Sequence, residues 1–280
     1  MPELPEMQAL AERVEAEFGG TAIKRATPIQ FSSLKTFDPP PESLAGRTLE
    51  SVGRRGKYLV LDFGGPRLLI HLSQGGRVDF ERPAKASRPK NGVVRVVFDD
   101  GAALLVKEFG TERKAGWWIL AERDDGPLVK LGPEPFSDEF EAIVTDGDDG
   151  RRVHTLLRDQ RTVAGIGRGF SDDILHHARL SPYASLSSLN DDARRSLVEA
   201  THTVLTEALQ KERARTGGLP NKLQGRFVVH GKAGEPCPRC RRRSGASRTS
   251  RTRSSIARPA RPGARSSPTD GYRASSASRG

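Results

Sequence analysis

The chain has 280 residues, of which 46 are Lys or Arg and 35 are Asp or Glu, so its net charge is +11. A hydrophobic fraction of 35% with 29% charged residues is typical of a globular protein with about two domains. No apolar run approaches the ~20 residues of a membrane span, and the acidic start lacks the pattern of a signal peptide. Only two cysteines are present, which excludes a disulfide framework, so we expect a cytoplasmic, nucleoid-associated location.

Most of the positive charge lies in the last part of the chain. Residues 241–280 contain 11 Arg and one acidic residue, which leaves a net charge of +1 for residues 1–240. The same segment holds 10 Ser and almost no large apolar residues, so we expect a disordered Arg/Ser-rich tail. A solvated basic tail and an out-of-frame translation of a GC-rich gene explain this composition equally well. The overall charge is therefore weak evidence for nucleic-acid binding.

The first half of the chain predicts one helix followed by strands. Apolar residues recur every three or four positions over 2–18, which indicates an amphipathic helix that ends at Gly19-Gly20. Short β-rich runs follow at 57–63, 67–72, 93–100 and 103–109, and turn residues separate them. We therefore expect residues 1–131 to form an N-terminal domain with a β-sandwich.

Helical patterns dominate the second half. They cover residues 138–144, 154–160, 171–180 and 191–214. We expect a helical domain over 132–225, a partial zinc-finger hairpin over 226–240 that begins as a strand, and the tail over 241–280. The fold class is therefore α+β with several domains.

The N-terminus carries residues with catalytic chemistry. The methionine before Pro2 is normally removed, which would leave a secondary amine with a pKa of about 8. Such an amine attacks the aldehyde carbon of a sugar and forms a cationic iminium. The flanking Glu3 and Glu6 could protonate a departing ring oxygen and position the amine. Taken alone, the same residues also suit an ordinary helix start.

Seven motifs in order show a specific resemblance over residues 1–240. They are MPELPE at the start, GRRGKYL (53–59), IHLSQGGRV (70–78), KEFG (107–110), LGPEP (131–135), LLRDQRTVAGIGRGFSDDIL (156–175) and GEPCPRC (234–240). Together they resemble the formamidopyrimidine-DNA glycosylase/endonuclease VIII family of base-excision repair enzymes. The resemblance implies a β-sandwich joined to a helix-two-turn-helix domain. It also implies a monomer that acts on damaged duplex DNA and needs no nucleotide cofactor.

The resemblance assigns roles to four residues. Pro2 would be the nucleophile on C1′, Glu3 the acid that opens the sugar ring, and Glu6 a supporting carboxylate. Lys57, which alone would pass for a surface lysine at a strand start, would act on the phosphate and in β-elimination. The implied activity is a bifunctional DNA glycosylase and abasic-site lyase for oxidised bases. The competing hypothesis is a non-catalytic module that binds damaged DNA.

The resemblance also points to DNA contacts. Gln74, Lys107 and Phe109 stand where the family has a Met, an Arg and a Phe that fill the gap left by an extruded base. Lysine cannot form the forked contact of arginine with a cytosine, so we expect altered discrimination of the opposite base. Gly167 and Arg168 belong to a glycine-rich helix start that would hold a DNA phosphate. A dinucleotide-binding loop would look similar, but no βαβ unit surrounds it.

The metal motif is incomplete. Cys237 and Cys240 supply two ligands, whereas a structural zinc site needs four. The family places a second C-x-x-C about twenty residues further on. No Cys or His follows Cys240, so we do not expect a complete zinc site within this chain. By the resemblance, the loop that faces the damaged base falls within 213–224, and its sequence does not indicate which lesion is bound. The resemblance makes oxidised purines the expected substrate, and oxidised pyrimidines are the alternative.

Overall fold

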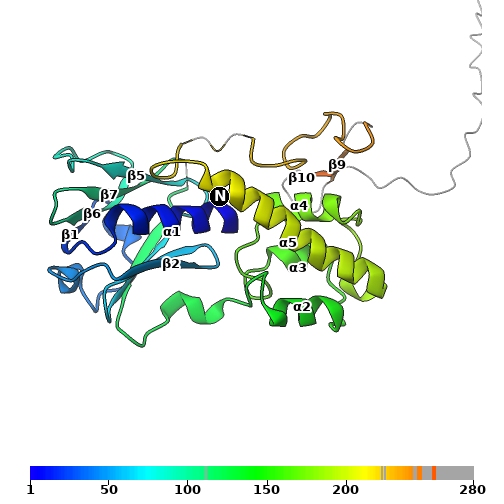
Figure 1. Ribbon diagram of the computed structural model, residues 1–280, viewed down its shortest axis with the longest axis horizontal. Helices are drawn as coiled ribbons and strands as arrows, with labels where there is room; N and C mark the ends of the chain where they lie inside the picture. Colours follow the sequence, from blue (N-terminus) through cyan, green and yellow to red (C-terminus); the bar gives the residue numbers. More distant parts are fainter. Residues whose placement is uncertain (111, 222, 224, 242–244, 248–253, 257–280) are drawn as a thin grey trace, which may run out of the picture.

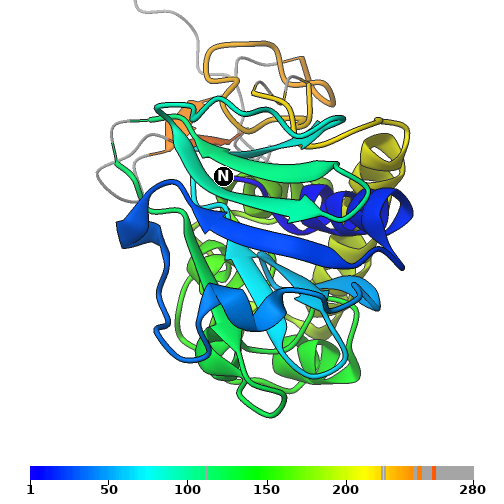
Figure 2. The same cartoon turned by 90° about the vertical axis from the view of Figure 1, so that its left-hand side faces the viewer.

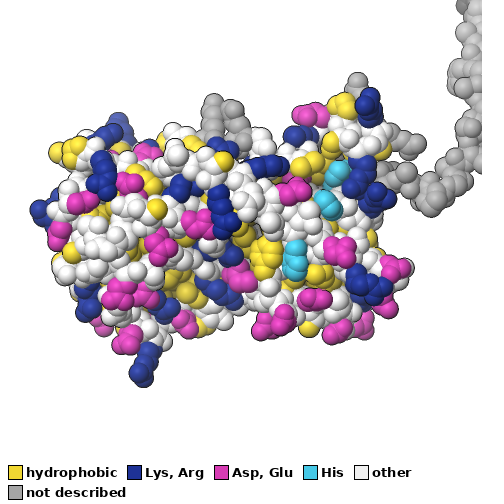
Figure 3. All heavy atoms as spheres, in the orientation of Figure 1, with side chains coloured by type: hydrophobic (Ala, Val, Ile, Leu, Met, Phe, Trp, Pro, Cys, Tyr) yellow, Lys and Arg dark blue, Asp and Glu magenta, His cyan; other side chains and the backbone are white. Residues whose placement is uncertain are grey.

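The computed structural model describes residues 1–280 except 111, 222, 224, 242–244, 248–253 and 257–280. Figure 1 shows a β-rich half and a helical half beside each other; the first helix extends across the β-rich half, the last long helix extends across the helical half, and the two come together near the N-terminus. Figure 3 shows basic and acidic side chains interspersed over the visible face, in keeping with the nearly neutral residues 1–240. No helix among the described residues is long and apolar enough to cross a membrane.

The first helix, α1 (Leu4–Phe18), confirms the periodicity of the N-terminus but begins at Leu4 because Glu3 caps it. Glu3 and Glu6 form a reciprocal capping box, and a proline occupies the first turn. The buried face of α1 contributes to both hydrophobic cores: Leu4 to the helical core and Met7 to the sandwich core. The chain therefore starts at the junction of the two halves.

Two antiparallel four-stranded sheets form the sandwich (Figure 2). The first has the order β1 (Ile23–Pro28), β6 (Gly92–Phe98), β7 (Ala103–Glu108), β5 (Gly76–Glu81). The second has the order β2 (Ser51–Arg55), β3 (Tyr58–Asp62), β4 (Arg67–His71), β8 (Gly116–Leu120). The predicted runs correspond to β3, β4, β6 and β7. Short 3₁₀ turns, η1 (Phe31–Ser33), η2 (Pro41–Leu44) and η3 (Gly126–Lys130), lie in the connections.

The helical half confirms the second set of patterns. It consists of α2 (Asp138–Thr145), α3 (Val153–Arg158), α4 (Arg168–His177) and α5 (Asp191–Arg213), with η4 (Leu186–Ser188) before the last. Ser137 caps α2 and Asn190 caps α5, each through a side-chain oxygen that accepts a backbone N–H. The helices share one hydrophobic core, which includes Phe140, Phe170 and Leu197.

The strand expected at the start of 226–240 is absent, and turns take its place. The backbone N–H groups there bond to a side chain of α4 instead of to a partner strand, so the expected hairpin is wrong in this detail. Within 241–280 the structure describes β9 (Gly245–Ser247) and β10 (Ser254–Ile256), which pair antiparallel. Most of the expected tail lies outside the described residues. The expected domain boundaries stay predictions.

Candidate active site

A cavity of about 830 Å³ lies where the two halves meet. Its walls come from the N-terminus, from the turn before β3, from two loops of the sandwich and from the start of α4. The volume suits a ligand of nucleotide size, and cavities at domain junctions are frequent ligand sites. The predicted site residues that line it are Glu3, Lys57, Gln74, Phe109, Gly167 and Arg168.

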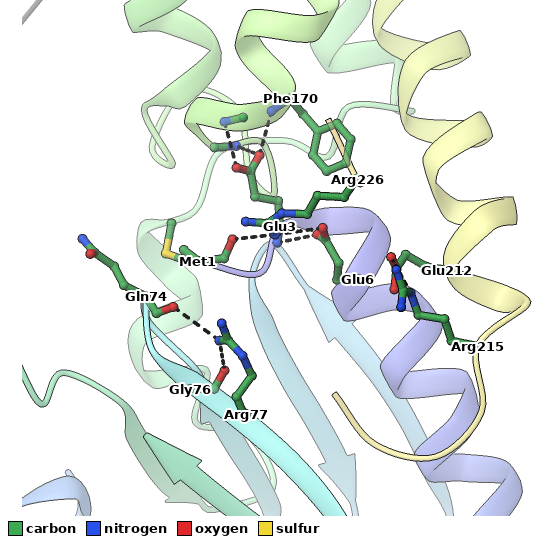
Figure 4. A network of polar contacts seen from close by, with 12 residues as sticks. Met1, Glu3, Glu6, Gln74, Gly76, Arg77, Phe170, Glu212, Arg215 and Arg226 are labelled. Carbon is green, nitrogen blue, oxygen red and sulfur yellow. Dashed lines mark hydrogen bonds and ion pairs between the residues drawn. The ribbon is translucent and has the colours of Figure 1, made fainter. Parts of the chain in front are cut away.

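Glu3 joins the two halves through its carboxylate. It is buried and accepts backbone N–H bonds from Gly167 (2.6 Å), Gly169 (3.0 Å) and Phe170 (3.3 Å) at the start of α4 (Figure 4). A helix N-terminus attracts negative charge, and here the anion is this carboxylate. The sequence suggested that these amides bind a DNA phosphate. In the structure they donate to the carboxylate of Glu3 instead. DNA contact by Gly167 and Arg168 stays a prediction.

Gly167 leaves just enough room for that carboxylate. A Cβ added to it would lie 2.5 Å from the Cδ of Glu3. Gly167→Ala is therefore expected to lower the free energy of unfolding by about 2 kcal/mol, because the carboxylate must leave the helix start. Urea denaturation measures the change. Gly150→Ala is the matched control, since its Cβ would meet nothing within 4 Å. Equal stabilities of the two variants would contradict this account of the helix start.

Glu6 lies fully buried behind Glu3. One carboxylate oxygen accepts the Glu3 backbone N–H (2.8 Å), and the other lies 3.0 Å from Nη1 of Arg226. Burial raises the pKa of Glu6, and the positive charge of Arg226 opposes that rise. The amine of Met1 lines the same cavity, and burial together with Arg226 lowers its pKa. A lowered pKa enlarges the neutral, nucleophilic fraction of an amine.

Lys57 is a buried amine in the turn between β2 and β3, with 4% of its surface exposed. Burial lowers its pKa, while the charges of Glu3 and Glu6 act to raise it. No carboxylate in the described part of the chain lies within ion-pair distance of Lys57. Burial and the charge of Lys57 also lower the pKa of neighbouring His71 to about 4, which keeps that imidazole neutral near pH 7.

Two sandwich loops bring Gln74 and Phe109 to the cavity. The N–H of Phe109 donates to the carbonyl of Gly75 (2.8 Å), and a Cβ on Gly75 would lie 1.9 Å from the carbonyl oxygen of Phe109. Gln74 is exposed, and Phe109 exposes 42% of its surface. Lys107 is absent from the described cavity lining. Its ammonium pairs with Asp79 and lies 5.5 Å from the Phe109 ring centroid.

The sequence analysis assigned no role to several basic residues of the cavity, although Arg77 and Arg158 lie within two of the quoted motifs. Arg77, Arg158, Arg226 and His230 also line it. Arg77 donates to the carbonyl oxygens of Gly76 (2.6 Å) and Asn221 (3.1 Å), so it joins β5 to the loop after α5. No sequence pattern distinguishes these arginines from the many others in the chain. Only the fold brings them to the N-terminus.

The two cysteines do not make a structural zinc site. Sγ of buried Cys237 lies 3.3 Å from Nε2 of His176, and Cys240 is exposed. Within the described ranges, no three His, Cys, Asp or Glu side chains are grouped so that they could hold a metal ion. A structural zinc site requires four such ligands. The residues present therefore do not fit the metal that the resemblance implied.

Comparisons with known proteins match both halves of the chain. Residues 1–118 match the model of the formamidopyrimidine-DNA glycosylase N-terminal domain, and residues 131–217 match that of its H2TH domain. Formamidopyrimidine-DNA glycosylases of Heliobacterium modesticaldum and Geotalea daltonii are 32% and 35% identical, each aligned over 86% of this chain and 92% of its own length.

Solved structures show the same fold. The Fpg protein of Thermus thermophilus is 27% identical with a TM-score of 0.76, and the match covers 91% of this chain and 97% of that one. The Lactococcus lactis Fpg in complex with DNA containing an abasic site is 24% identical with a TM-score of 0.81, at the same coverage.

Proposed function

Because the chain belongs to the formamidopyrimidine-DNA glycosylase family, we propose that it excises oxidised bases from duplex DNA and nicks the strand at the resulting abasic site. The observation that carries the proposal is the junction cavity, where the chain's N-terminus, a helix-bound carboxylate and a buried lysine meet. A cavity of this size is what an enzyme needs when it takes a nucleotide out of the base stack.

In the proposed excision step, removal of Met1 frees the secondary amine of Pro2. The amine nitrogen attacks C1′ of the damaged nucleotide, and the base departs with the electrons of the glycosidic bond. The attacking nitrogen loses its proton, and the departing base gains one. The sugar ring opens when the C1′–O4′ bond breaks and a proton passes to O4′; in this proposal Glu3, which lines the cavity, carries that proton. The product is an iminium that joins the amine to C1′. A water molecule later hydrolyses it and restores the free amine.

In the proposed nicking step, the iminium makes the C2′ protons acidic. A base removes one of them, and the C3′–O bond breaks with the phosphate as leaving group. Lys57 suits this role because burial lowers its pKa and no carboxylate in the described chain pairs with it. Excision therefore needs the N-terminus, and nicking needs a second basic group.

The proposed substrate is damaged duplex DNA bound by a monomer. The DNA complex of the Lactococcus lactis relative supports this partner. We propose that the exposed ring of Phe109 stacks on an unpaired base, and the pairing of Lys107 with Asp79 supports weak discrimination of the opposite base. Duplexes that each carry one oxidised purine or one oxidised pyrimidine would identify the preferred lesion.

Borohydride reduction tests the proposed mechanism. The chain is expected to form a covalent adduct with an abasic duplex, because borohydride reduces an iminium to a stable amine. Denaturing electrophoresis detects the adduct. The control is a variant with one residue inserted before Pro2, which locks the nitrogen in a peptide bond and should abolish trapping. A wild type that binds the duplex but forms no adduct would support the non-catalytic hypothesis, and equal trapping by both chains would exclude Pro2.

A further inference from the structure

Residues 226–230 lie against α4, and a single carboxylate holds their backbone. The oxygens of Asp173 accept N–H bonds from Val228 (2.7 Å), Val229 (2.8 Å) and His230 (3.3 Å). Asp173 is itself buried, with 3% of its surface exposed. Three N–H donors on one buried carboxylate define the path of this segment as firmly as a strand partner would. We call this contact the Asp173 clamp.

Side chains reinforce the Asp173 clamp. Nδ1 of His230 lies 2.6 Å from one oxygen of Asp172, whose other oxygen lies 3.0 Å from Nε2 of buried His154. The ring of Phe227 packs edge-on against Phe170, with 5.2 Å between the centroids. The segment is therefore fixed to α4 through protein contacts on both sides of its backbone.

The fixed segment presents Arg226 to the start of the chain (Figure 4). Nη1 of Arg226 lies 3.0 Å from the carboxylate of Glu6 and 3.2 Å from the carbonyl oxygen of Met1. The contact with the Met1 carbonyl ends when Met1 is removed, whereas the contact with Glu6 remains. The guanidinium also lies over the Phe227 ring, 4.3 Å from its centroid, and its side chain is only 16% exposed.

We infer that Arg226, presented by the Asp173 clamp, is a positioning residue that holds the Glu6 carboxylate, which in turn accepts the backbone N–H of Glu3 beside the nucleophilic nitrogen of Pro2. The inference deepens the proposed function and rests on it. Arg226 acts through these groups and need not touch the sugar. No metal is required to place it, since the described contacts of the segment are made by α4 and α1.

The charge of Arg226 has a second effect, on the amine itself. The groups that face the Met1 amine are Glu3 at the cap of α1, Glu6 from α1, Arg77 from β5, and Arg226. Arg226 and Arg77 lower the pKa of the amine, and the two carboxylates raise it; the effect of Arg226 is larger than that of Glu6. Pro2 becomes the first residue when Met1 is removed, so we expect a neutral side chain at position 226 to raise the pKa of the Pro2 amine in the same way. At a given pH, a smaller fraction would then be nucleophilic.

The test compares Arg226→Met with Arg226→Lys. The rate of borohydride-trapped adduct formation is measured in single turnover against pH. With methionine we expect the acid limb of the profile to move to higher pH and the rate near neutrality to fall about tenfold, which corresponds to one pKa unit. With lysine, which keeps the charge, we expect most of the wild-type profile to return. Identical profiles for wild type and Arg226→Met, or for the two variants, would overturn the inference.

A measurement without DNA separates this inference from the proposed function. Formaldehyde and cyanoborohydride methylate a neutral N-terminal amine, and mass spectrometry of the N-terminal peptide gives the pH profile of that reaction. A shifted methylation profile with no DNA adduct from wild type would refute the proposed function and keep the inference. An unshifted profile with normal trapping would refute the inference alone.

A substitution of Asp173 tests the role of the Asp173 clamp separately. Asp173→Asn replaces one acceptor oxygen with an NH₂ group that cannot accept the backbone N–H bonds. We expect it to shift the methylation profile in the same direction as Arg226→Met, in protein whose circular dichroism shows that it is folded. EDTA treatment of wild type should leave the profile unchanged. An Asp173→Asn profile identical to wild type, or a profile that moves with EDTA, would overturn the role of the clamp.

Discussion

Replacing Lys57 by methionine is expected to reduce cleavage of an abasic strand by about 10²- to 10⁴-fold and, at the same time, to stabilise the fold. The activity falls because the base proposed for the C2′ proton is lost. The stability rises by roughly 1 kcal/mol because methionine has a similar shape and buries no amine. Gel assays of strand cleavage and urea denaturation measure the two effects. A substitution that lowers activity but raises stability is typical of a residue that is retained for its chemistry.

The stability gain should depend on pH. The folded-state pKa of Lys57 is lowered by burial, so between that value and the unfolded value the unfolded chain binds more protons. Wild-type stability therefore rises with pH across this window, and the advantage of Lys57→Met shrinks there. Exposed Lys130, replaced by methionine, is the control and should change neither property. A Lys57→Met protein that is less stable than wild type at neutral pH would contradict this view of the buried amine.

Replacing Asp172 by alanine is expected to destabilise the protein by about 3–5 kcal/mol, among the largest losses for a residue outside the cavity. Asp172 is fully buried and lies between His154 and His230, and the former is only 1% exposed. Removal of the carboxylate leaves a buried imidazole without its acceptor. Urea denaturation at neutral pH measures the loss. Asp148→Ala removes an exposed carboxylate of the same domain and is expected to change little.

The difference in the free energy of unfolding between wild type and Asp172→Ala should become smaller at acid pH. Burial acts to raise the pKa of Asp172, but the hydrogen bonds from His154 and His230 outweigh it, and its pKa falls below the ordinary value. A group with a lowered folded pKa stabilises the protein above the unfolded pKa, and this contribution disappears as pH falls through the folded pKa. The gap between wild type and Asp172→Ala should thus narrow in strong acid. If the stability difference between wild type and Asp172→Ala stays constant into strong acid, the charge of the carboxylate is not what stabilises the protein.

The elements that the sequence predicted best are those with a strong periodic pattern. The helices α1 and α5 and the strands β3, β4, β6 and β7 follow directly from apolar spacing. The strands β1, β2 and β5 escaped prediction because charged residues interrupt their apolar pattern, whereas β8 escaped because its run of large apolar residues is only four residues long. Their partners in the sheet, rather than their own side chains, determine them.

The candidate site divides in the same way. Glu3 and Lys57 were found from short motifs because each motif is local. The bonds that complete the site join residues far apart: Gly167 is 164 positions from Glu3, and Arg226 is 220 positions from Glu6. No local pattern encodes such a pair. The glycine-rich turn was recognised as an anion site, but the anion came from the chain itself, because the start of α1 packs against the start of α4.

The orientation of Glu3 depends on contact between the two halves of the molecule, because its carboxylate is bound by the start of α4. Neither half alone can orient this acid, since one half carries the carboxylate and the other supplies its three amide donors. A chain whose halves separate, even briefly, would lose chemical competence before it lost its secondary structure. In the proposed mechanism, a chain whose halves are apart could therefore bind no sugar beside a correctly oriented Glu3.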